Sequence, residues 1–405
     1  MSVLPQRTGF TFLLLFLFAV PEIRDTGPWT VLWAAPAILC AAILIAWAAE
    51  SAQYFVAQGF ALAILAWLQT LPEFAVEAVI AWHRQVPLLL ANLTGALRLL
   101  TGFGWPMIYF TAATFNRRNG KGPLRVIRLH DHHAVEVVGL LAPLLYMGVV
   151  AWKHSLTNFD AAVLILIYAA YLWILSKLPP EDAETIEDLE AIPRRIVTAP
   201  RAQRIVAIAG LFVAGGVLIY LSAEPFLGSL LALSTVLGIP TFVFVQWMAP
   251  LVSEFPEMAS TFYWARTVDR APVALMNMVS SNINQWTLLA AMLPIIYSIS
   301  AGQNSAIAFD AQQETEMLLT IAQATIGLVF LINMELAWWE AGVLFVLFAI
   351  PFASHSLAGP VTWIYFGWAG IEVGRMFAGR RKPRALVEFG RVWRTVVRKK
   401  AGEAD

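Results

Sequence analysis

An apolar run from Tyr54 to Trp82 is interrupted near its middle by a proline and two acidic residues, Pro72, Glu73 and Glu77. A run of this length is typical of a membrane-spanning helix. A proline inside a helix costs about 3 kcal/mol or more, and an ionised carboxylate at the bilayer centre costs at least about 2.5–3.5 kcal/mol. A chain tolerates both only where they face protein or a water-filled cavity. The sequence therefore predicts that other helices surround this segment.

The composition agrees with a polytopic membrane protein. Charged residues make up 13% of the 405 residues, about half of the ~25% that is usual in soluble domains. The single cysteine, Cys40, excludes an internal disulfide and a multi-cysteine metal site. The short run Gly9–Val20 is interpreted as a span, with a signal peptide as the alternative. Further spans are predicted at Val31–Ala49, Pro87–Phe115, Ala134–Trp152, Ala161–Leu178, Ile205–Leu221, Leu227–Trp264, Pro272–Ser300, Met317–Met334, Ala341–Ala353 and Val361–Met376.

The distribution of basic residues predicts the orientation. If the N-terminus lies inside, the basic clusters after Phe115, after Trp264 and after Met376 all fall on the cytoplasmic side, as the positive-inside rule requires. We therefore expect an integral protein of the cell (inner) membrane, with both termini cytoplasmic and the lipid bilayer as its partner. The basic tail is expected to face anionic lipid rather than nucleic acid. Its apolar positions, interleaved with arginines, are typical of a short amphipathic helix on the membrane surface.

The interrupted acidic pattern returns in the segment Val252–Met258, where Glu257 takes the place of Glu73. When the same offset is added to the positions of several other spans in the first half, it reaches spans in the second half. It also relates the turn near Arg84, predicted to lie outside, to the turn near Asp269, predicted to lie inside. We predict an all-α polytopic membrane protein with two inverted five-helix repeats and an extra span at each end. The predicted domains are an N-terminal extra span (1–30), the first inverted repeat (31–178), a cytoplasmic linker (179–204), the second inverted repeat (205–357), and the last span with its basic cytoplasmic tail (358–405).

Each half carries a second polar position on the following helix. Asn92 follows Glu73, and Asn277 follows Glu257, at nearly the same spacing along the chain. This spacing places each asparagine on the next helix at a depth similar to that of the glutamate. Two carboxylates and two carboxamides would then converge near the midplane. Such oxygen ligands suit hard cations, Ca²⁺ above all and Na⁺ as a second option.

These motifs resemble those of the calcium/cation antiporter superfamily, the sodium/calcium exchanger group. Thr70–Glu73 with Asn92 resembles its first repeat motif, and Phe255–Glu257 with Asn277 and Ser281 resembles the second. The resemblance implies a secondary active cation antiporter, not an enzyme, that exchanges Ca²⁺ for Na⁺ or H⁺ by alternating access without a cofactor. The residues expected to bind the cation are Thr70, Glu73, Asn92, Ser253, Glu254, Glu257, Asn277 and Ser281, with Glu73 and Glu257 as the metal ligands.

The residues leave three alternative functions open. Glu77 and Glu254 add carboxylates that could serve a proton-coupled transporter of another substrate. The histidine-rich segment His130–Glu136 could serve a membrane metalloenzyme, although adjacent histidines at a span end favour an interfacial run. Arg98 is expected to pair with Glu73 or Glu77, because an unpaired cation in a membrane is costly. A permanent pair with Glu73 would make the protein a scaffold that does not transport.

Overall fold

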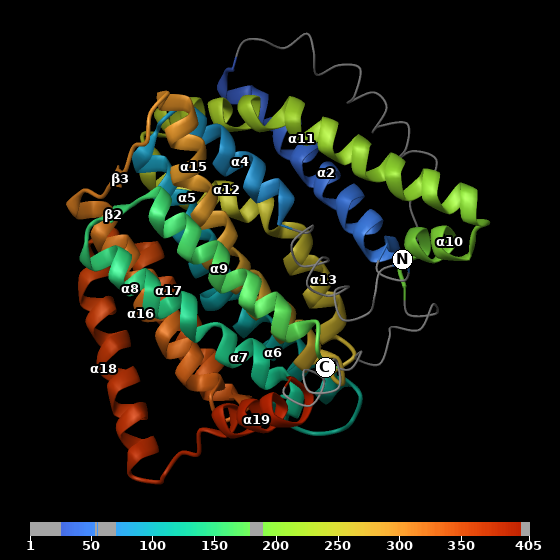
Figure 1. Ribbon diagram of the computed structural model, residues 1–405, viewed down its shortest axis with the longest axis vertical. Coiled ribbons are helices and arrows are strands. Elements are labelled where there is room, and N and C mark those ends of the chain that lie inside the picture. Colours follow the sequence, from blue (N-terminus) through green and yellow to red (C-terminus); the bar gives the residue numbers. More distant parts are fainter. Residues whose placement is uncertain (1–25, 53–54, 56–69, 179–188, 398–405) are drawn as a thin grey trace, which may run out of the picture.

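The computed structural model describes residues 26–52, 55, 70–178 and 189–397 (Figure 1). The predicted span Gly9–Val20, most of the apolar segment before Thr70 and the first ten residues of the predicted linker (179–188) lie outside the described residues. Seven helical segments in the described part are long and apolar enough to cross a membrane. They are Pro28–Ala52, Val86–Arg118, Asp131–Trp152, Asn158–Leu175, Arg201–Leu237, Ala271–Ala301 and Ala311–Leu331.

The elements follow one another in a nearly continuous series of helices. The first half contains η2 (Pro28–Thr30), α2 (Val31–Ala52), α4 (Leu71–Trp82), α5 (Val86–Leu99), the π-helical turn η4 (Leu100–Gly104), α6 (Trp105–Arg118), β1 (Val126–Arg128), η5 (Asp131–His133), α7 (Ala134–Gly139), α8 (Leu141–Trp152), β2 (Ser155–Leu156) and α9 (Asn158–Leu175). The second half contains α10 (Ala191–Thr198), α11 (Arg201–Leu237), α12 (Thr241–Ser253), α13 (Phe255–Ala265), α14 (Ala271–Asn284), the π-helical turn η7 (Gln285–Leu289), α15 (Ala290–Ala301), β3 (Ile307–Ala308), α16 (Ala311–Leu331), β4 (Glu335–Ala337) and α17 (Trp338–Ala353). The chain then continues through η8 (His355–Leu357), α18 (Ala358–Phe377), α19 (Arg384–Val392) and η9 (Trp393–Val397).

The predicted boundary between the spans Ile205–Leu221 and Leu227–Trp264 is wrong. Helix α11 passes through the polar segment between them and is 37 residues long. Glu224 does not interrupt it, because its side chain is 70% exposed and faces away from the core. The helix ends instead at Gly238, whose φ of 66° is the left-handed conformation that favours glycine after a helix. The rest of the second predicted span forms α12 and α13.

The two prolines of the acidic motifs start new helices. Pro72 lies in the first turn of α4, and Pro256 lies in the first turn of α13. A proline is tolerated there, because its missing N–H would have no partner within the helix. Glu73 and Glu257 consequently occupy the first turn of their helices, where the positive end of the helix dipole favours a negative charge.

Backbone irregularities recur at a nearly constant offset along the chain. Arg84 and Val268 both have positive φ angles, 55° and 62°, and they are separated by the same interval as Glu73 and Glu257. The π-helical turn that begins at Leu100 returns at Gln285, after nearly the same interval. These positions have no side-chain chemistry in common, so the recurrence belongs to the backbone path of the two halves.

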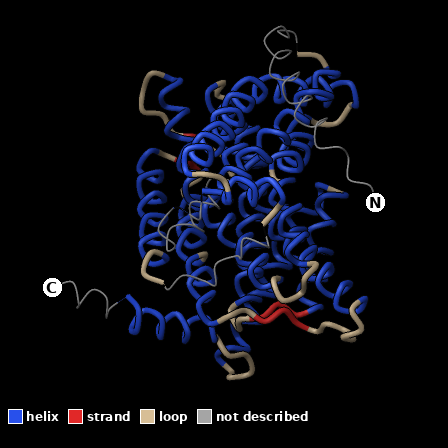
Figure 2. Tube along the Cα trace, turned by 90° about the vertical axis from the view of Figure 1, so that its right-hand side faces the viewer, coloured by secondary structure: helices blue, strands red, loops and turns tan. Residues whose placement is uncertain are grey.

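Two short antiparallel ribbons join the halves. Strand β1 pairs with β4, and β2 pairs with β3. Figure 2 shows one ribbon near each end of the molecule, and Figure 1 labels β2 and β3 at the upper one. The prediction of a purely helical chain missed these strands, because segments of two or three residues are too short to show an alternating pattern.

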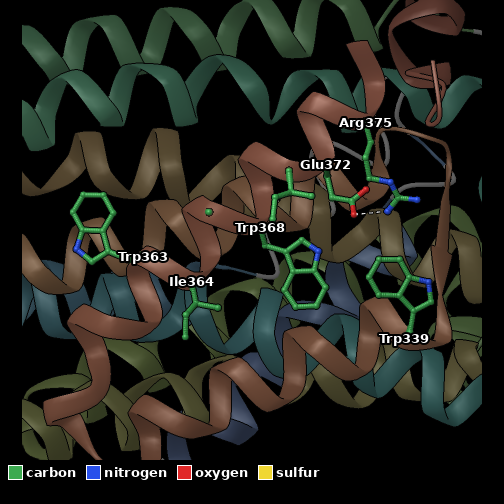
Figure 3. A pocket seen from close by; sticks show the side chains of 8 residues that line it. Trp339, Trp363, Ile364, Trp368, Glu372 and Arg375 are labelled. Carbon is green, nitrogen blue, oxygen red and sulfur yellow. Dashed lines mark hydrogen bonds and ion pairs between the residues drawn. The ribbon is translucent and has the colours of Figure 1, made fainter. Parts of the chain in front are cut away.

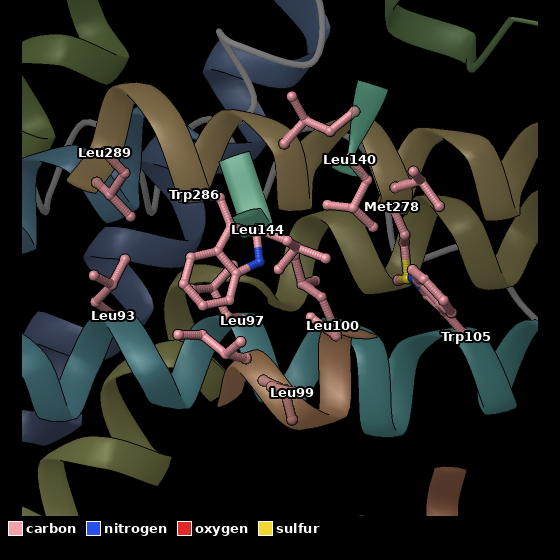
Figure 4. Close-up of a cluster of buried hydrophobic side chains, with 14 of the residues drawn as sticks. Leu93, Leu97, Leu99, Leu100, Trp105, Leu140, Leu144, Met278, Trp286 and Leu289 are labelled. Atoms are coloured by element: carbon pink, nitrogen blue, oxygen red, sulfur yellow. The ribbon is translucent and has the colours of Figure 1, made fainter. Parts of the chain in front are cut away.

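Helix α5 lies at the centre of the core, and the described side chains from Leu88 to Leu99 are all buried. Figure 4 shows Leu93 and Leu97 packed with Trp286, and Trp105 packed with Met278, so the core is shared between the two halves. Helix α12 approaches α5 closely at Gly95, where an added Cβ would lie 1.9 Å from the Gln246 carbonyl oxygen.

The C-terminal helices pack against the second half. Helix α18 covers α16, and Figure 3 shows a groove lined by Trp339, Trp363 and Trp368 that ends at the ion pair between Glu372 and Arg375. The tail sequence was expected to form an amphipathic helix, and it forms α19 (red in Figure 1). This helix packs against η5 and α7, so protein covers part of its surface.

Candidate cation-binding site

Three acidic side chains from the two halves meet in the core. Glu73 belongs to α4, Glu257 belongs to α13, and Glu254 lies at the junction of α12 and α13. All three are buried, with at most 4% of their surface exposed. The Glu254 carboxyl lies within hydrogen-bonding reach of both Glu73 and Glu257. We refer to Glu73, Glu254 and Glu257 as the carboxyl cluster.

Gln285 connects this cluster across the two halves. Its Nε2 donates to Glu73 Oε2 at 2.8 Å and to Glu254 Oε1 at 2.6 Å. The side chain projects from η7, and it is fully buried. The site predicted from sequence did not include Gln285. The available signal was its position four residues after Ser281, which places both side chains on one helix face.

The two asparagines have different carboxylate partners. Asn277 Nδ2 donates to Glu257 Oε1 at 3.3 Å, within the carboxyl cluster. Asn92 Nδ2 donates to Glu77 Oε1 at 3.0 Å, one turn beyond Glu73. The first half therefore presents two acids on one face of α4, and its asparagine orients the second of them.

The hydroxyl residues of the predicted site are buried beside the cluster or on the helices that form it. Thr70 Oγ1 accepts a 2.6 Å hydrogen bond from Asn284 Nδ2, which the sequence hypothesis did not include. Ser253 Oγ donates to the Ala249 carbonyl of its own helix at 3.1 Å. The Ser281 side chain lies beside the Glu257 carboxyl. Thr70 and Asn284 thus link α4 to α14, in addition to the link through Gln285.

Several buried oxygen atoms around the cluster have no N–H donor within the described part of the chain. Buried polar atoms are nearly always paired, so these atoms retain the capacity to bind a water molecule or an ion. Apart from the Ser281 hydroxyl, these atoms are carboxylate or carboxamide oxygens, the ligands that hard cations prefer. They are Glu73 Oε1, Glu77 Oε2, Asn92 Oδ1, Glu257 Oε2, Ser281 Oγ, Asn284 Oδ1 and Gln285 Oε1.

The prediction that Arg98 pairs with Glu73 or Glu77 is wrong. Its Nη1 lies 2.9 Å from Oε2 of Glu316 on α16. Arg98 follows Asn92 by six residues on α5, which is a rotation of about 240° around the helix axis. Its side chain therefore leaves α5 on a different face from Asn92. The idea of a scaffold locked by an Arg98–Glu73 pair loses its basis.

Comparisons with known proteins identify the family of this chain. A family model described as "Sodium/calcium exchanger protein" matches residues 27–177 and 207–353. The structure titled "Crystal Structure of H+/Ca2+ Exchanger CAX" is 32% identical and superposes with a TM-score of 0.86, covering 94% of this chain and 95% of that chain. No curated protein sequence matches the chain.

Two more distant structures are similar in fold alone. Native YfkE is 15% identical, with a TM-score of 0.59 over 87% of this chain and 97% of that chain. The sodium-calcium exchanger NCX_Mj is 17% identical, with a TM-score of 0.52 over 80% of this chain and 97% of that chain. Family membership makes the protein a transporter, so the metalloenzyme alternative built on His130–Glu136 is not supported. The family expected from the motifs is confirmed: this chain belongs to the sodium/calcium exchanger protein family.

Proposed function

We propose that this protein exchanges Ca²⁺ for protons across a membrane, and that Glu73, Glu254 and Glu257 are its central ligands. The observation that carries the proposal is the contact of Glu254 with both other carboxyl groups. Carboxyl groups this close cannot all be ionised at once, so they share protons when no cation is bound. A divalent cation would supply the positive charge instead. Protons and Ca²⁺ therefore compete for the same oxygens, which is the basis of exchange.

The surrounding oxygens support Ca²⁺ as the cargo. Ca²⁺ takes six to eight oxygen ligands, and the carboxyl cluster alone offers six carboxylate oxygens. Asn92 and Asn277 would add carboxamide oxygens, and Thr70, Ser253 and Ser281 would add hydroxyls. Not every one of these groups is needed to complete a shell, so the cation could change partners as the site opens.

The proton is the favoured counter-ion because the 32% identical relative is titled an H⁺/Ca²⁺ exchanger. Na⁺ is the second candidate, favoured by the description of the matching family. The family model's two matched segments also fall almost wholly within the two predicted repeats, 31–178 and 205–357. A site with one ligand set from each repeat suits alternating access, in which the two sets separate toward one side at a time.

We infer that the repeats have opposite orientations in the membrane. The recurrence of Arg84 as Val268 supports equivalent backbone paths. In the order of the elements, β1 in the first half corresponds to β3 in the second, and β2 corresponds to β4. The β1–β4 ribbon therefore corresponds to the β2–β3 ribbon, and the two lie near opposite ends of the molecule. A twofold relation in the membrane plane would produce this arrangement. With the basic loops inside, both termini would face the cytoplasm, and the cell (inner) membrane is the expected location.

The test is radiolabelled Ca²⁺ uptake by proteoliposomes with an imposed gradient of H⁺ or Na⁺. An acidic interior should drive uptake, and a trapped dye should report the loss of internal protons. Glu73→Gln and Glu257→Gln should abolish uptake, whereas Glu224→Gln, at a side chain that is 70% exposed, should not. Uptake driven by a Na⁺ gradient but not by an H⁺ gradient would identify Na⁺ as the counter-ion in place of the proton. Equal uptake by all the proteins would end the calcium proposal, and proton flux without Ca²⁺ dependence would favour another substrate.

A further inference from the structure

Three histidines gather at the start of α7, outside the carboxyl cluster. His130, His132 and His133 each offer a ring nitrogen, and these three atoms lie within 4.8 Å of one another. The ring centroids are 4.4–5.4 Å apart. His130 is exposed, His132 is partly exposed and His133 is buried. The group thus has one member in the protein interior and one at the surface, where an ion can enter.

We propose that His130, His132 and His133 form a binding site for a transition-metal dication of the Zn²⁺ class. Imidazole nitrogens suit Zn²⁺, Cu²⁺, Ni²⁺ and Co²⁺, whereas Ca²⁺ and Mg²⁺ require oxygen ligands. Zn²⁺ lies about 2.0–2.1 Å from each nitrogen, so tetrahedral ligands are about 3.3 Å apart. Rotation of the exposed His130 ring can bring its nitrogen closer to those of His132 and His133. The buried His133 ring provides the fixed ligand.

A contact of His133 with the backbone would change on metal binding. The His130 backbone N–H donates to His133 Nδ1 at 3.3 Å, which is beyond the usual range for such a bond. Metal binding at His133 Nδ1 would replace this weak contact. The fourth coordination position would remain open to water on the exposed side of the cluster.

The site would connect elements that belong to different parts of the chain. Asp131, between the histidines, lies 3.8 Å from Nη1 of Arg391 on α19. Helix α19 packs against η5 and α7, and α7 packs against α14, the helix that carries Asn277 and Ser281. A metal held by η5 would stiffen this contact between the tail and a helix of the carboxyl cluster. The site is thus a structural or regulatory one, and its metal is not the transported ion.

The experiment is a Co²⁺ titration of the purified full-length protein in detergent, carrying an affinity tag without histidines. Wild type should bind one Co²⁺ with the strong visible absorption of a tetrahedral site, and Zn²⁺ should displace it while millimolar Ca²⁺ should not. His130→Ala and the double variant His130→Ala/His132→Ala should weaken binding by at least about tenfold. His83→Ala and His154→Ala are matched controls, because these half-exposed histidines pair with Glu224 and Glu314 elsewhere.

Two results would overturn the proposal. One is a Co²⁺ affinity that is the same in His130→Ala and wild type, which excludes His130 as a ligand and with it the three-histidine site. Since the His130 side chain is exposed, its removal should leave folding intact even where the double variant fails to fold. The other is loss of Co²⁺ binding in Glu73→Gln/Glu257→Gln with binding retained in His130→Ala, which would place the metal in the carboxyl cluster. Neither result depends on whether the protein transports Ca²⁺, so the two proposals fail separately.

Discussion

Arg98 and Glu316 form an ion pair within the core, with Nη1 and Oε2 2.9 Å apart and at most 2% of either side chain exposed. Gln246 Nε2 donates to the same Glu316 oxygen at 2.7 Å, and the Arg98 guanidinium lies over the Trp247 ring at 4.8 Å. His355 Nδ1 lies 3.2 Å from the other carboxylate oxygen. Helices α5, α12 and α16 are therefore tied together beside the candidate cation site, without a positive charge being placed in it.

Removing one member of this pair should destabilise the protein strongly. Arg98→Met leaves the Glu316 charge buried without its partner, and breaking a buried pair in this way typically costs about 3–5 kcal/mol. Thermal unfolding in detergent should show a clear fall in Tm. The double variant Arg98→Met/Glu316→Gln removes both charges, so its Tm should lie above that of the single variant. A single variant as stable as wild type would contradict a role for the pair in holding these helices.

Gly95→Ala should disrupt the contact between α5 and α12. The new Cβ would lie 1.9 Å from the Gln246 carbonyl oxygen, a backbone atom that cannot rotate away. Overpacking of this kind costs about 1–3 kcal/mol or more. The matched control is Gly216→Ala in α11, where an added Cβ has no neighbour within 4 Å. Size-exclusion profiles and Tm should separate the two variants, and equal stability would show that α12 can shift freely.

Gln285→Ala should weaken Ca²⁺ binding, because it removes the hydrogen bonds that orient Glu73 and Glu254. A hydrogen bond to a charged group contributes about 1.5–3 kcal/mol, so the apparent Kd for Ca²⁺ should rise by about tenfold to a hundredfold. Isothermal titration of the purified protein measures this directly. Gln303→Ala, at an exposed glutamine in the loop after α15, is the control. An unchanged Kd in Gln285→Ala would remove this glutamine from the site.

Asn92 and Glu77 should act as a unit. Their side chains are joined by a buried 3.0 Å hydrogen bond, and residues in direct contact typically show coupling energies of about 0.5–3 kcal/mol. The effects of Asn92→Ala and Glu77→Gln on unfolding should therefore not add in the double variant. The changes in unfolding free energy caused by Asn92→Ala and Glu73→Gln should come closer to adding up in their double variant. Stronger coupling of Asn92 to Glu73 than to Glu77 would contradict the hydrogen bonding described here.

Much of the candidate site follows from local sequence patterns. Long apolar runs predict membrane helices, and a proline within such a run predicts a break in the helix. Glu73 and Glu257, which each follow such a proline, could therefore be predicted as acids at the starts of half-helices. The similar spacing from each glutamate to its asparagine placed Asn92 and Asn277 on the next helices. The similarity of the two proline–glutamate motifs predicted that Glu73 and Glu257 correspond, and both lie in the first turn of a helix.

Only the packing of the helices decided which side chains meet. Because α5 is buried on all sides, its hydrophobic pattern does not specify how the helix is rotated about its axis. That rotation nevertheless decides the partner of every polar residue on the helix. Arg98 consequently faces Glu316 instead of Glu73, a pairing that no local pattern could select. Gln285 likewise reaches Glu73 because η7 packs against α5, α8 and α9 of the first half. The depth of a residue in the membrane does not specify its neighbour across the core.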